Sequence, residues 1–135
     1  MGTAGDYNLS VDAGAGADGI TTVGAQLTSA DTIDGGADTD TITLSADAAT
    51  IVDADFTNID NVEGFTTADG ANSVTLGTKA DDSGLATVTG GAGNDTINAS
   101  AFAGSLTIST GSGGNDTITL GTANGQINVV DATNQ

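Results

Sequence analysis

The chain repeats a short unit of strand and turn about every 21 residues, and no other feature constrains its fold as strongly. Residues 35–43, 90–98 and 111–119 read GGADTDTIT, GGAGNDTIN and GSGGNDTIT. In each copy an Asp follows the first Gly by five residues and precedes Thr and Ile. The last two copies are 21 residues apart. Self-similarity at such a period is typical of repeat architectures.

Apolar residues carry this spacing along the whole chain in two interleaved series with steps of 19 to 24 residues. The first series comprises Ile20, Ile42, Val62, Ala86, Leu106 and Ile127. The second series comprises Val11, Ile33, Val52, Val74, Ile97 and Ile118. Polar and apolar residues alternate around most of these positions, which predicts half-buried strands. Clusters of Gly and Asn between them predict tight turns.

Two short strands per 21-residue coil, stacked about six times, predict an all-β fold of the parallel β-solenoid type (a β-roll or β-helix). Residues 1–135 then form a single repeat domain, as a subunit or a fragment of a longer array. Residues 46–63 fit the repeat worst and are predicted to bulge. Phe56 and Phe102 fall between strands and are predicted to fill irregular corners.

The charge of the chain raises a physical problem for any such fold. The acidic residues are 17 Asp and Glu63, against Lys79 as the only base, so the formal net charge is −17. Only 27 of 135 residues are Ile, Val, Leu or Phe, a composition close to that of disordered proteins. Stacked coils would bring like charges close together, so the sequence predicts that a cation offsets their repulsion.

Composition also excludes several functions. One base cannot supply the phosphate contacts of a nucleic-acid-binding protein, and no apolar run is long enough for membrane insertion. Without Cys or His there is neither thiolate nor imidazole chemistry. Paired carboxylates could in principle hydrolyse sugars, but the chain has no Trp and stacked coils offer no deep cleft. We therefore expect no enzymatic activity.

The Gly-Asp turns point to calcium. Residues 90–98 match every defined position of the pattern Gly-Gly-x-Gly-x-Asp-x-U-x, where U is a large apolar residue. Residues 111–119 depart once, at Ser112, and residues 35–43 depart once, at Asp38. This motif resembles the hemolysin-type calcium-binding repeats of secreted bacterial RTX proteins and related repeats of bacterial surface-layer proteins. The resemblance covers about a quarter of the chain directly, and the 21-residue period departs from the family's usual 18 residues per coil.

The resemblance implies that turn carbonyls and Asp carboxylates bind calcium between successive coils. The candidate calcium-site residues in these three turns are Asp95, Asp116, Asp40, Asp38, Asn94, Asn115, Gly91, Gly93, Gly36 and Gly114. Elementary chemistry agrees, since calcium prefers carboxylate and carbonyl oxygens and Gly permits the turns that direct them inward.

Acids gather two residues before the apolar positions. They are Asp18, Asp40 and Asp60 in the first series, and Asp31, Asp95 and Asp116 in the second. One edge of the stack therefore carries acids in the N-terminal half only, and the other mainly in the C-terminal half. The alternative is that each motif only forms a tight turn in which Asp bonds its own backbone. We expect Asp53, Asp55, Asp81 and Asp82 to be solvated loop acids.

These features predict a calcium-stabilised structural module on a bacterial surface or in an extracellular matrix, where calcium is around millimolar. No capping helix is evident at either end, so we expect homo-oligomers that stack end to end into a filament or layer. One alternative is an ice-binding or adhesin solenoid, because pairs such as Thr41/Thr43 and Thr117/Thr119 face outward, although Asn61/Glu63 and Gln126/Asn128 would interrupt the Thr ladder. Another is the secretion repeat of a larger enzyme or toxin.

Overall fold

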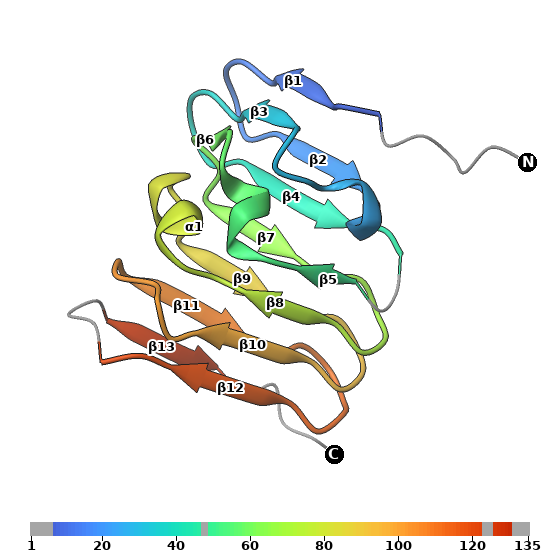
Figure 1. The fold of residues 1–135 in the computed structure, drawn as a ribbon, viewed down its shortest axis with the longest axis vertical. Coiled ribbons are helices and arrows are strands. Elements are labelled where there is room, and N and C mark those ends of the chain that lie inside the picture. Colours follow the sequence, from blue (N-terminus) through green and yellow to red (C-terminus); the bar gives the residue numbers. More distant parts are fainter. Residues whose placement is uncertain (1–6, 47–48, 123–125, 131–135) are drawn as a thin grey trace, which may run out of the picture.

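The chain folds as a parallel β-solenoid, which a computed structural model describes over residues 7–46, 49–122 and 126–130 (Figure 1). One face is a six-stranded sheet in the order β13-β11-β9-β7-β4-β2. Its strands are β2 (Gly19–Thr22), β4 (Thr41–Leu44), β7 (Gly64–Thr66), β9 (Thr87–Thr89), β11 (Leu106–Ser109) and β13 (Ile127–Val130). Neighbours are parallel and partner residues are 20 to 23 apart. Six strands separated by five turns of chain confirm the predicted fold class.

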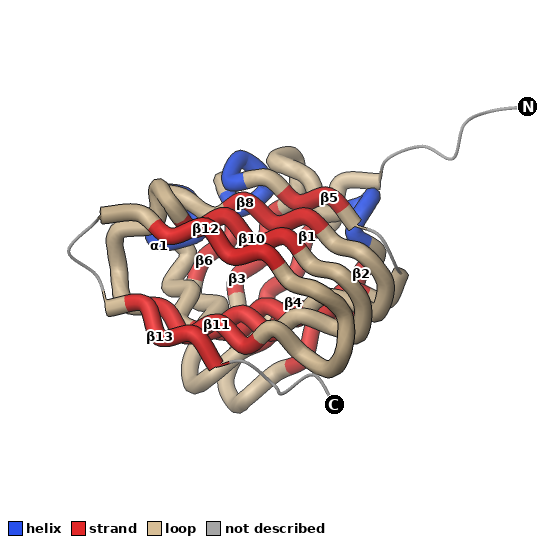
Figure 2. The backbone as a smooth tube through the Cα atoms, turned by 90° about the horizontal axis from the view of Figure 1, so that it is seen from below, coloured by secondary structure: helices blue, strands red, loops and turns tan. Residues whose placement is uncertain are grey.

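The second face is divided into two shorter parallel sheets. The N-terminal one contains β1 (Ser10–Asp12), β3 (Thr32–Asp34) and β6 (Ile59–Asp60). The C-terminal one contains β5 (Thr50–Ile51), β8 (Ser73–Thr75), β10 (Thr96–Ala99) and β12 (Thr117–Leu120). Figure 2 looks along the stack and shows the two faces as separate layers joined by loops.

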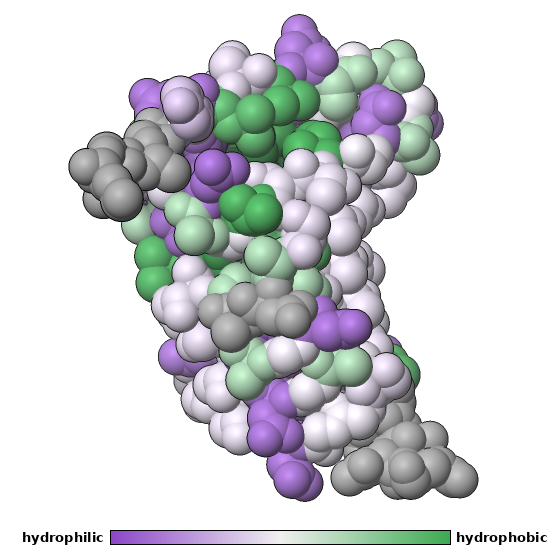
Figure 3. Space-filling model, turned by 90° about the vertical axis from the view of Figure 1, so that its right-hand side faces the viewer, coloured by the Kyte–Doolittle hydropathy of each residue, from purple (hydrophilic) through white to green (hydrophobic). Residues whose placement is uncertain are grey.

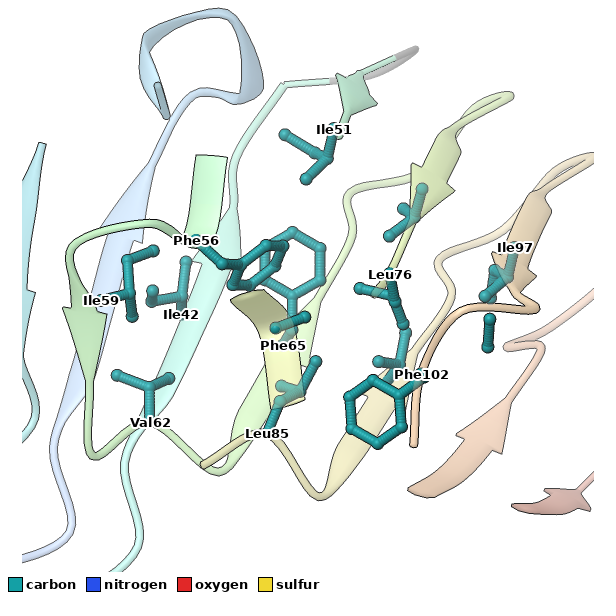
Figure 4. Packing of buried hydrophobic residues seen from close by; sticks show 14 of the residues in the cluster. Ile42, Ile51, Phe56, Ile59, Val62, Phe65, Leu76, Leu85, Ile97 and Phe102 are labelled. Atoms are coloured by element: carbon teal, nitrogen blue, oxygen red, sulfur yellow. The ribbon is translucent and has the colours of Figure 1, made fainter. Parts of the chain in front are cut away.

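The third coil causes this division because it supplies a strand to both short sheets. β5 pairs with β8, β6 pairs with β3, and the 3₁₀-helix η2 (Asp53–Phe56) lies between them. The Phe56 ring packs edge-to-face on Phe65 with 5.5 Å between the ring centroids (Figure 4). The irregularity predicted within residues 46–63 is therefore present in their described part, and Phe56 fills it. Residues 47–48 lie outside the described part.

The core is the inward side of both faces. Ile42, Phe65, Val88 and Ile108 follow one another along the six-stranded sheet, and all are at most 1 % exposed. Phe102, in the loop after β10, is also 1 % exposed, as expected for a corner residue. Each large side chain buried in this way stabilises the fold by about 1.5–3 kcal/mol.

The register of the first apolar series differs from its prediction. The residues in line with Ile42 are Phe65 and Val88, whereas Val62 lies before β7 and Ala86 is exposed. Leu106 and Ile108 both face inward, so a slip of two residues leaves the alternation unchanged. Corner contacts therefore decide the register.

In the second series the predicted Val52 is replaced by Ile51. Ile51 is fully buried and pairs with Val74, while Val52 is 45 % exposed at the start of η2. The helix begins directly after Val52, so the pattern of alternation ends there.

Two further short helices are η1 (Gly24–Gln26) and α1 (Thr78–Asp82). The carboxylate of Asp53 lies at the start of α1. Its Oδ1 accepts the Gly77 and Ala80 backbone N–H groups at 2.7 and 3.0 Å. The expectation that Asp53 is a solvated loop acid was wrong, because it caps a helix one coil later. In the described residues no helix has the length and apolar character needed to cross a membrane.

Candidate functional site at the coil corners

Two corners of the stack carry the Gly-Asp turns. Corner I leads from the second face to the six-stranded sheet and includes loops 13–18, 35–40 and 61–63. Corner II leads back and includes loops 67–72, 90–95 and 110–116. The turn that ends in Asp40 lies in corner I, and those that end in Asp95 and Asp116 lie in corner II. The division of the acids between two edges agrees with the sequence prediction.

One carboxylate oxygen of each motif Asp joins two coils. The Asp18 backbone N–H donates to Oδ1 of Asp40 at 2.7 Å. The Asn72 N–H donates to Oδ1 of Asp95 at 2.9 Å, and the Asp95 N–H donates to Oδ1 of Asp116 at 2.9 Å. Each donor lies one coil before its acceptor. We call these contacts corner hydrogen bonds.

The corner hydrogen bonds form a series on each side of the stack. Each joins residues that come two positions before an inward strand residue. The other three run from Leu9 N–H to Asp31, from Asp40 N–H to Glu63 and from Ala49 N–H to Asn72, at 2.7, 2.9 and 3.0 Å. Glu63 therefore occupies the place predicted for Asp60, which is exposed on β6. The alternative was that each motif Asp bonds only the backbone of its own turn. It is wrong in this respect, because these side chains accept hydrogen bonds from the preceding coil.

The second carboxylate oxygen of Asp40 and of Asp95 is unusual. Both residues are almost fully buried, at 0 and 2 % exposure. Oδ1 of each is hydrogen-bonded, but Oδ2 is buried and finds no hydrogen-bond partner within the described structure. Leaving a charged oxygen buried and unpaired is costly. An ion or another polar ligand at Oδ2 would remove that cost.

A glycine faces each of these oxygens. A Cβ atom added to Gly35 or to Gly90 would lie 2.7 Å from Oδ2 of Asp40 or Asp95, respectively. The same added atoms would overlap the carbonyl oxygens of Asn61 and Thr110, which belong to the following coil. Because these glycines have no side chain, a carboxylate oxygen and a carbonyl oxygen of the following coil both approach each of them closely. We call these two arrangements the Asp40 cradle and the Asp95 cradle.

The cradles have ligands of the type that calcium prefers. Calcium takes six to eight oxygens from carboxylates, carbonyls and water. No three acidic side chains converge on a metal position anywhere in the described chain. A calcium ion here would therefore be held by a carboxylate together with carbonyl and water oxygens.

The third motif copy differs from the other two. Asp116 lies in the last described coil and is only half-buried, and its Oδ1 accepts the Asp95 N–H. The added Cβ of Gly111 would meet the carbonyls of Gly90 and Gly91 instead of the Asp116 carboxylate. The described coils thus contain two cradles, although the motif occurs three times.

The other predicted site residues are turn residues. Asp38 and Asn94 are exposed, and so is Asn115, whose backbone N–H donates to Oδ1 of Asn94 at 2.7 Å. Asp38 has φ +81° where the other copies place Gly, so its backbone conformation is strained. The structure does not bring these three side chains to the cradles.

The predicted glycines allow neighbouring coils to approach. Added Cβ atoms at Gly36, Gly91, Gly93 and Gly114 would contact the backbone of Gly14, Ala68, Gly70 and Gly93, respectively. Figure 3 views the molecule from the side of corner II and shows a surface of mainly intermediate hydropathy with separate hydrophilic groups. Gly35 and Gly90 are the first residues of their motifs, but the sequence prediction does not include them among the site residues. It also missed Asn72, Glu63 and the carbonyls of Asn61 and Thr110.

The Asp55 carboxyl has a raised pKa. Burial raises the pKa of the Asp55 carboxyl, the negative charge of Asp31 raises it further, and the hydrogen bond from the Val52 N–H opposes both. Asp55 sits at the start of η2 and not in a cradle.

Comparison with protein-family models, curated proteins and solved structures finds no match. The likeness to RTX and surface-layer repeats therefore rests on the Gly-Asp turns.

Proposed function

We propose that this chain is a calcium-stabilised structural module of a bacterial surface or extracellular matrix, and that its copies stack end to end into a filament or layer. The observation that carries the proposal is the buried, unpartnered Oδ2 of Asp40 and Asp95, each beside a glycine and a carbonyl oxygen. Calcium at these positions joins successive coils and offsets the repulsion of a chain with net charge −17. Sites with few carboxylates bind weakly, which suits the millimolar calcium outside cells.

Asn variants of the two cradle acids test the proposal. Asn keeps an Oδ1 acceptor for the corner hydrogen bond but replaces the charged Oδ2 with a neutral amide nitrogen. We expect Asp40→Asn and Asp95→Asn each to lose about half of the calcium-induced rise in Tm, and the double variant nearly all of it. Without calcium, each single variant should be at least as stable as the unsubstituted protein, because an uncompensated buried charge is gone.

Asp38→Asn is the matched control, since Asp38 belongs to the same turn as Asp40 but is exposed. It should keep the full response to calcium. Thermal unfolding followed by circular dichroism measures all four variants across a calcium titration. An undiminished calcium response in the double variant would show that the cradles do not bind the ion.

A second candidate function, ice binding, is favoured by the observed register. Aligned hydroxyls follow one another on the outward side of five neighbouring strands, at Thr21, Thr43, Thr66, Thr89 and Ser109. Asn61 and Glu63, which the sequence placed on this face, lie instead in corner I, and Gly64 and Thr66 take their place. The result is an uncharged hydroxyl row with a repeat of about 4.8 Å.

Thermal hysteresis measures this second function directly. The protein should separate its freezing and melting points, and Thr66→Lys should abolish the gap by placing a long charged side chain in the hydroxyl row. Thr75→Lys is the control, because Thr75 occupies the equivalent outward position on β8 of the other face. An unsubstituted protein without hysteresis would exclude the function.

A further inference from the structure

The two ends of the stack present different halves of the coil-to-coil contact. At the C-terminal end, the described strands β12 and β13 each have a paired neighbour on one side only. Leu120, Val129 and Val130 are 40 to 47 % exposed there. At the N-terminal end β1 and β2 are likewise edge strands, and Val11 and Ile20 are only partly buried. Each end therefore has apolar side chains and strand edges without a neighbour among the described strands.

The corner hydrogen bonds give these ends a polarity. In all six, the backbone N–H belongs to the earlier coil and the accepting side chain to the later one. Among the described coils, the first has an acceptor side chain, Asp18, to which no described earlier coil donates. Oδ2 of Asp18 is buried and lacks a hydrogen-bond partner among the described residues.

The matching donor lies at the other end of the molecule. Asp18 comes two residues before the inward Ile20 of β2. Ile127 likewise comes two residues before Val129, the residue of β13 that lies in the same row of the six-stranded sheet as Ile20. A first coil stacked on a last coil in the register of the six-stranded sheet would put the Asp18 carboxylate at the Ile127 N–H. Ile20 would then cover Val129, whereas β1 and β12 belong to different short sheets and share no register.

We propose that copies of this chain join head to tail in this register, with the first coil of one copy adding to the last coil of the next. The inference rests on the end-to-end assembly proposed above and specifies its interface. Facing outward pairs on the six-stranded face would be Gly19 with Asn128 and Thr21 with Val130, so neither pair sets two acids face to face despite the charge of the chain. A junction between unlike ends does not close on itself, which makes the product a filament.

A cysteine pair tests both register and polarity, because the chain itself has no Cys. In the proposed junction, residue 21 on β2 of one copy lies opposite residue 130 on β13 of the next, because both belong to one outward row of the six-stranded sheet. Their separation of about 4.8 Å is within the range that a disulfide spans. Within one copy they are five coil steps apart, about 24 Å, so an internal disulfide cannot form.

Under mild oxidation in millimolar calcium, the variant Thr21→Cys/Val130→Cys should form a ladder of covalent dimers, trimers and larger species. The single variants Thr21→Cys and Val130→Cys should remain monomeric on a non-reducing gel. Dimers of either single variant at the same yield would show that like ends meet, and would overturn the proposal. A folded double variant that stays monomeric would also overturn it.

Asp18→Ala tests the corner hydrogen bond across the junction. Loss of a charged acceptor should weaken association by about tenfold or more in sedimentation. Asp60→Ala removes the same charge at an exposed position on β6 and should leave association unchanged. Equal weakening by both substitutions would show that only net charge matters.

Thermal unfolding of dilute, unassembled protein separates this inference from the calcium proposal. If calcium raises Tm there but no ladder forms, the junction is wrong and calcium stabilisation stands. If the ladder forms equally well in chelator, the junction stands and its dependence on calcium is wrong.

Discussion

Removal of calcium is expected to lower Tm by about 10 to 20 °C. Two cradles with dissociation constants of about 10⁻⁴ to 10⁻³ M would each stabilise the fold by about 1.4 to 2.7 kcal/mol at 10 mM calcium. For a chain of 135 residues, one kcal/mol corresponds to about 3 to 5 °C in Tm. Circular dichroism melts in 10 mM calcium and in excess chelator measure the difference.

Magnesium is the necessary control, because any divalent cation screens a net charge of −17. Magnesium demands near-octahedral geometry and loses its water reluctantly, so a cradle with one fixed carboxylate oxygen and one fixed carbonyl oxygen should discriminate against it. We expect magnesium at equal concentration to give less than half of the calcium shift. Equal shifts with both ions would mean that charge screening alone stabilises the solenoid.

The fold could be predicted because its determinants are local and repeat. Alternation such as Thr117-Ile118-Thr119-Leu120 specifies a strand, and Gly clusters at a steady spacing specify its turns. Because the same pattern recurs at a fixed spacing, a strand predicted in one coil strengthens the prediction of the corresponding strand in the next. The irregular third coil was recognisable for the same reason, since residues 46–63 break the spacing.

Register could not be predicted from alternation alone, because a shift of two residues keeps every side chain on its face. Acceptor side chains at the corners supply the missing information. Glu63, three residues after Asp60, bonds the Asp40 N–H and brings Phe65 into line with Ile42. A search for an acid or Asn two residues before each inward position would have favoured the observed register.

The site was predicted in part. Asp40 and Asp95 were chosen from the motif, and the structure buries both beside a glycine and a carbonyl oxygen. Asp38 could not be separated from Asp40 by sequence, since both are acids in one Gly turn. The difference arises from backbone geometry, because Asp38 points to solvent at positive φ while Asp40 begins the inward alternation of β4.

Asn72 links the corner hydrogen bonds to the Asp95 cradle. Its Oδ1 accepts the Ala49 N–H, and its amide nitrogen donates to the Ala68 carbonyl at 2.7 Å and to Oδ1 of Asp95 at 3.0 Å. Asn72 is 3 % exposed, so water cannot readily replace these bonds. In the series of corner hydrogen bonds along corner II, Asn72 lies between Ala49 and Asp95. It is a neutral acceptor, whereas the next acceptor, Asp95, is an acid.

Asn72→Ala is therefore expected to cost about 3 kcal/mol of unfolding free energy, because it leaves the buried Ala49 N–H without its acceptor and removes the amide donor to the Ala68 carbonyl and to Oδ1 of Asp95. Urea unfolding measures the loss. Asn58→Ala is the control, since the Asn58 amide makes one exposed hydrogen bond, to the Ser29 carbonyl, and should cost less than about 1 kcal/mol. Similar losses in both variants would mean that the corner hydrogen bonds add little to stability.

Asn72→Asp separates the structural role of this residue from its electrostatic one. The carboxylate keeps the acceptor for Ala49 but places a second charge next to Oδ1 of Asp95. Without calcium this variant should be less stable than the unsubstituted protein, because like charges repel strongly when buried. With calcium the deficit should shrink, since an ion in the Asp95 cradle is attracted to both carboxylates. A deficit that calcium leaves unchanged would place the ion away from corner II.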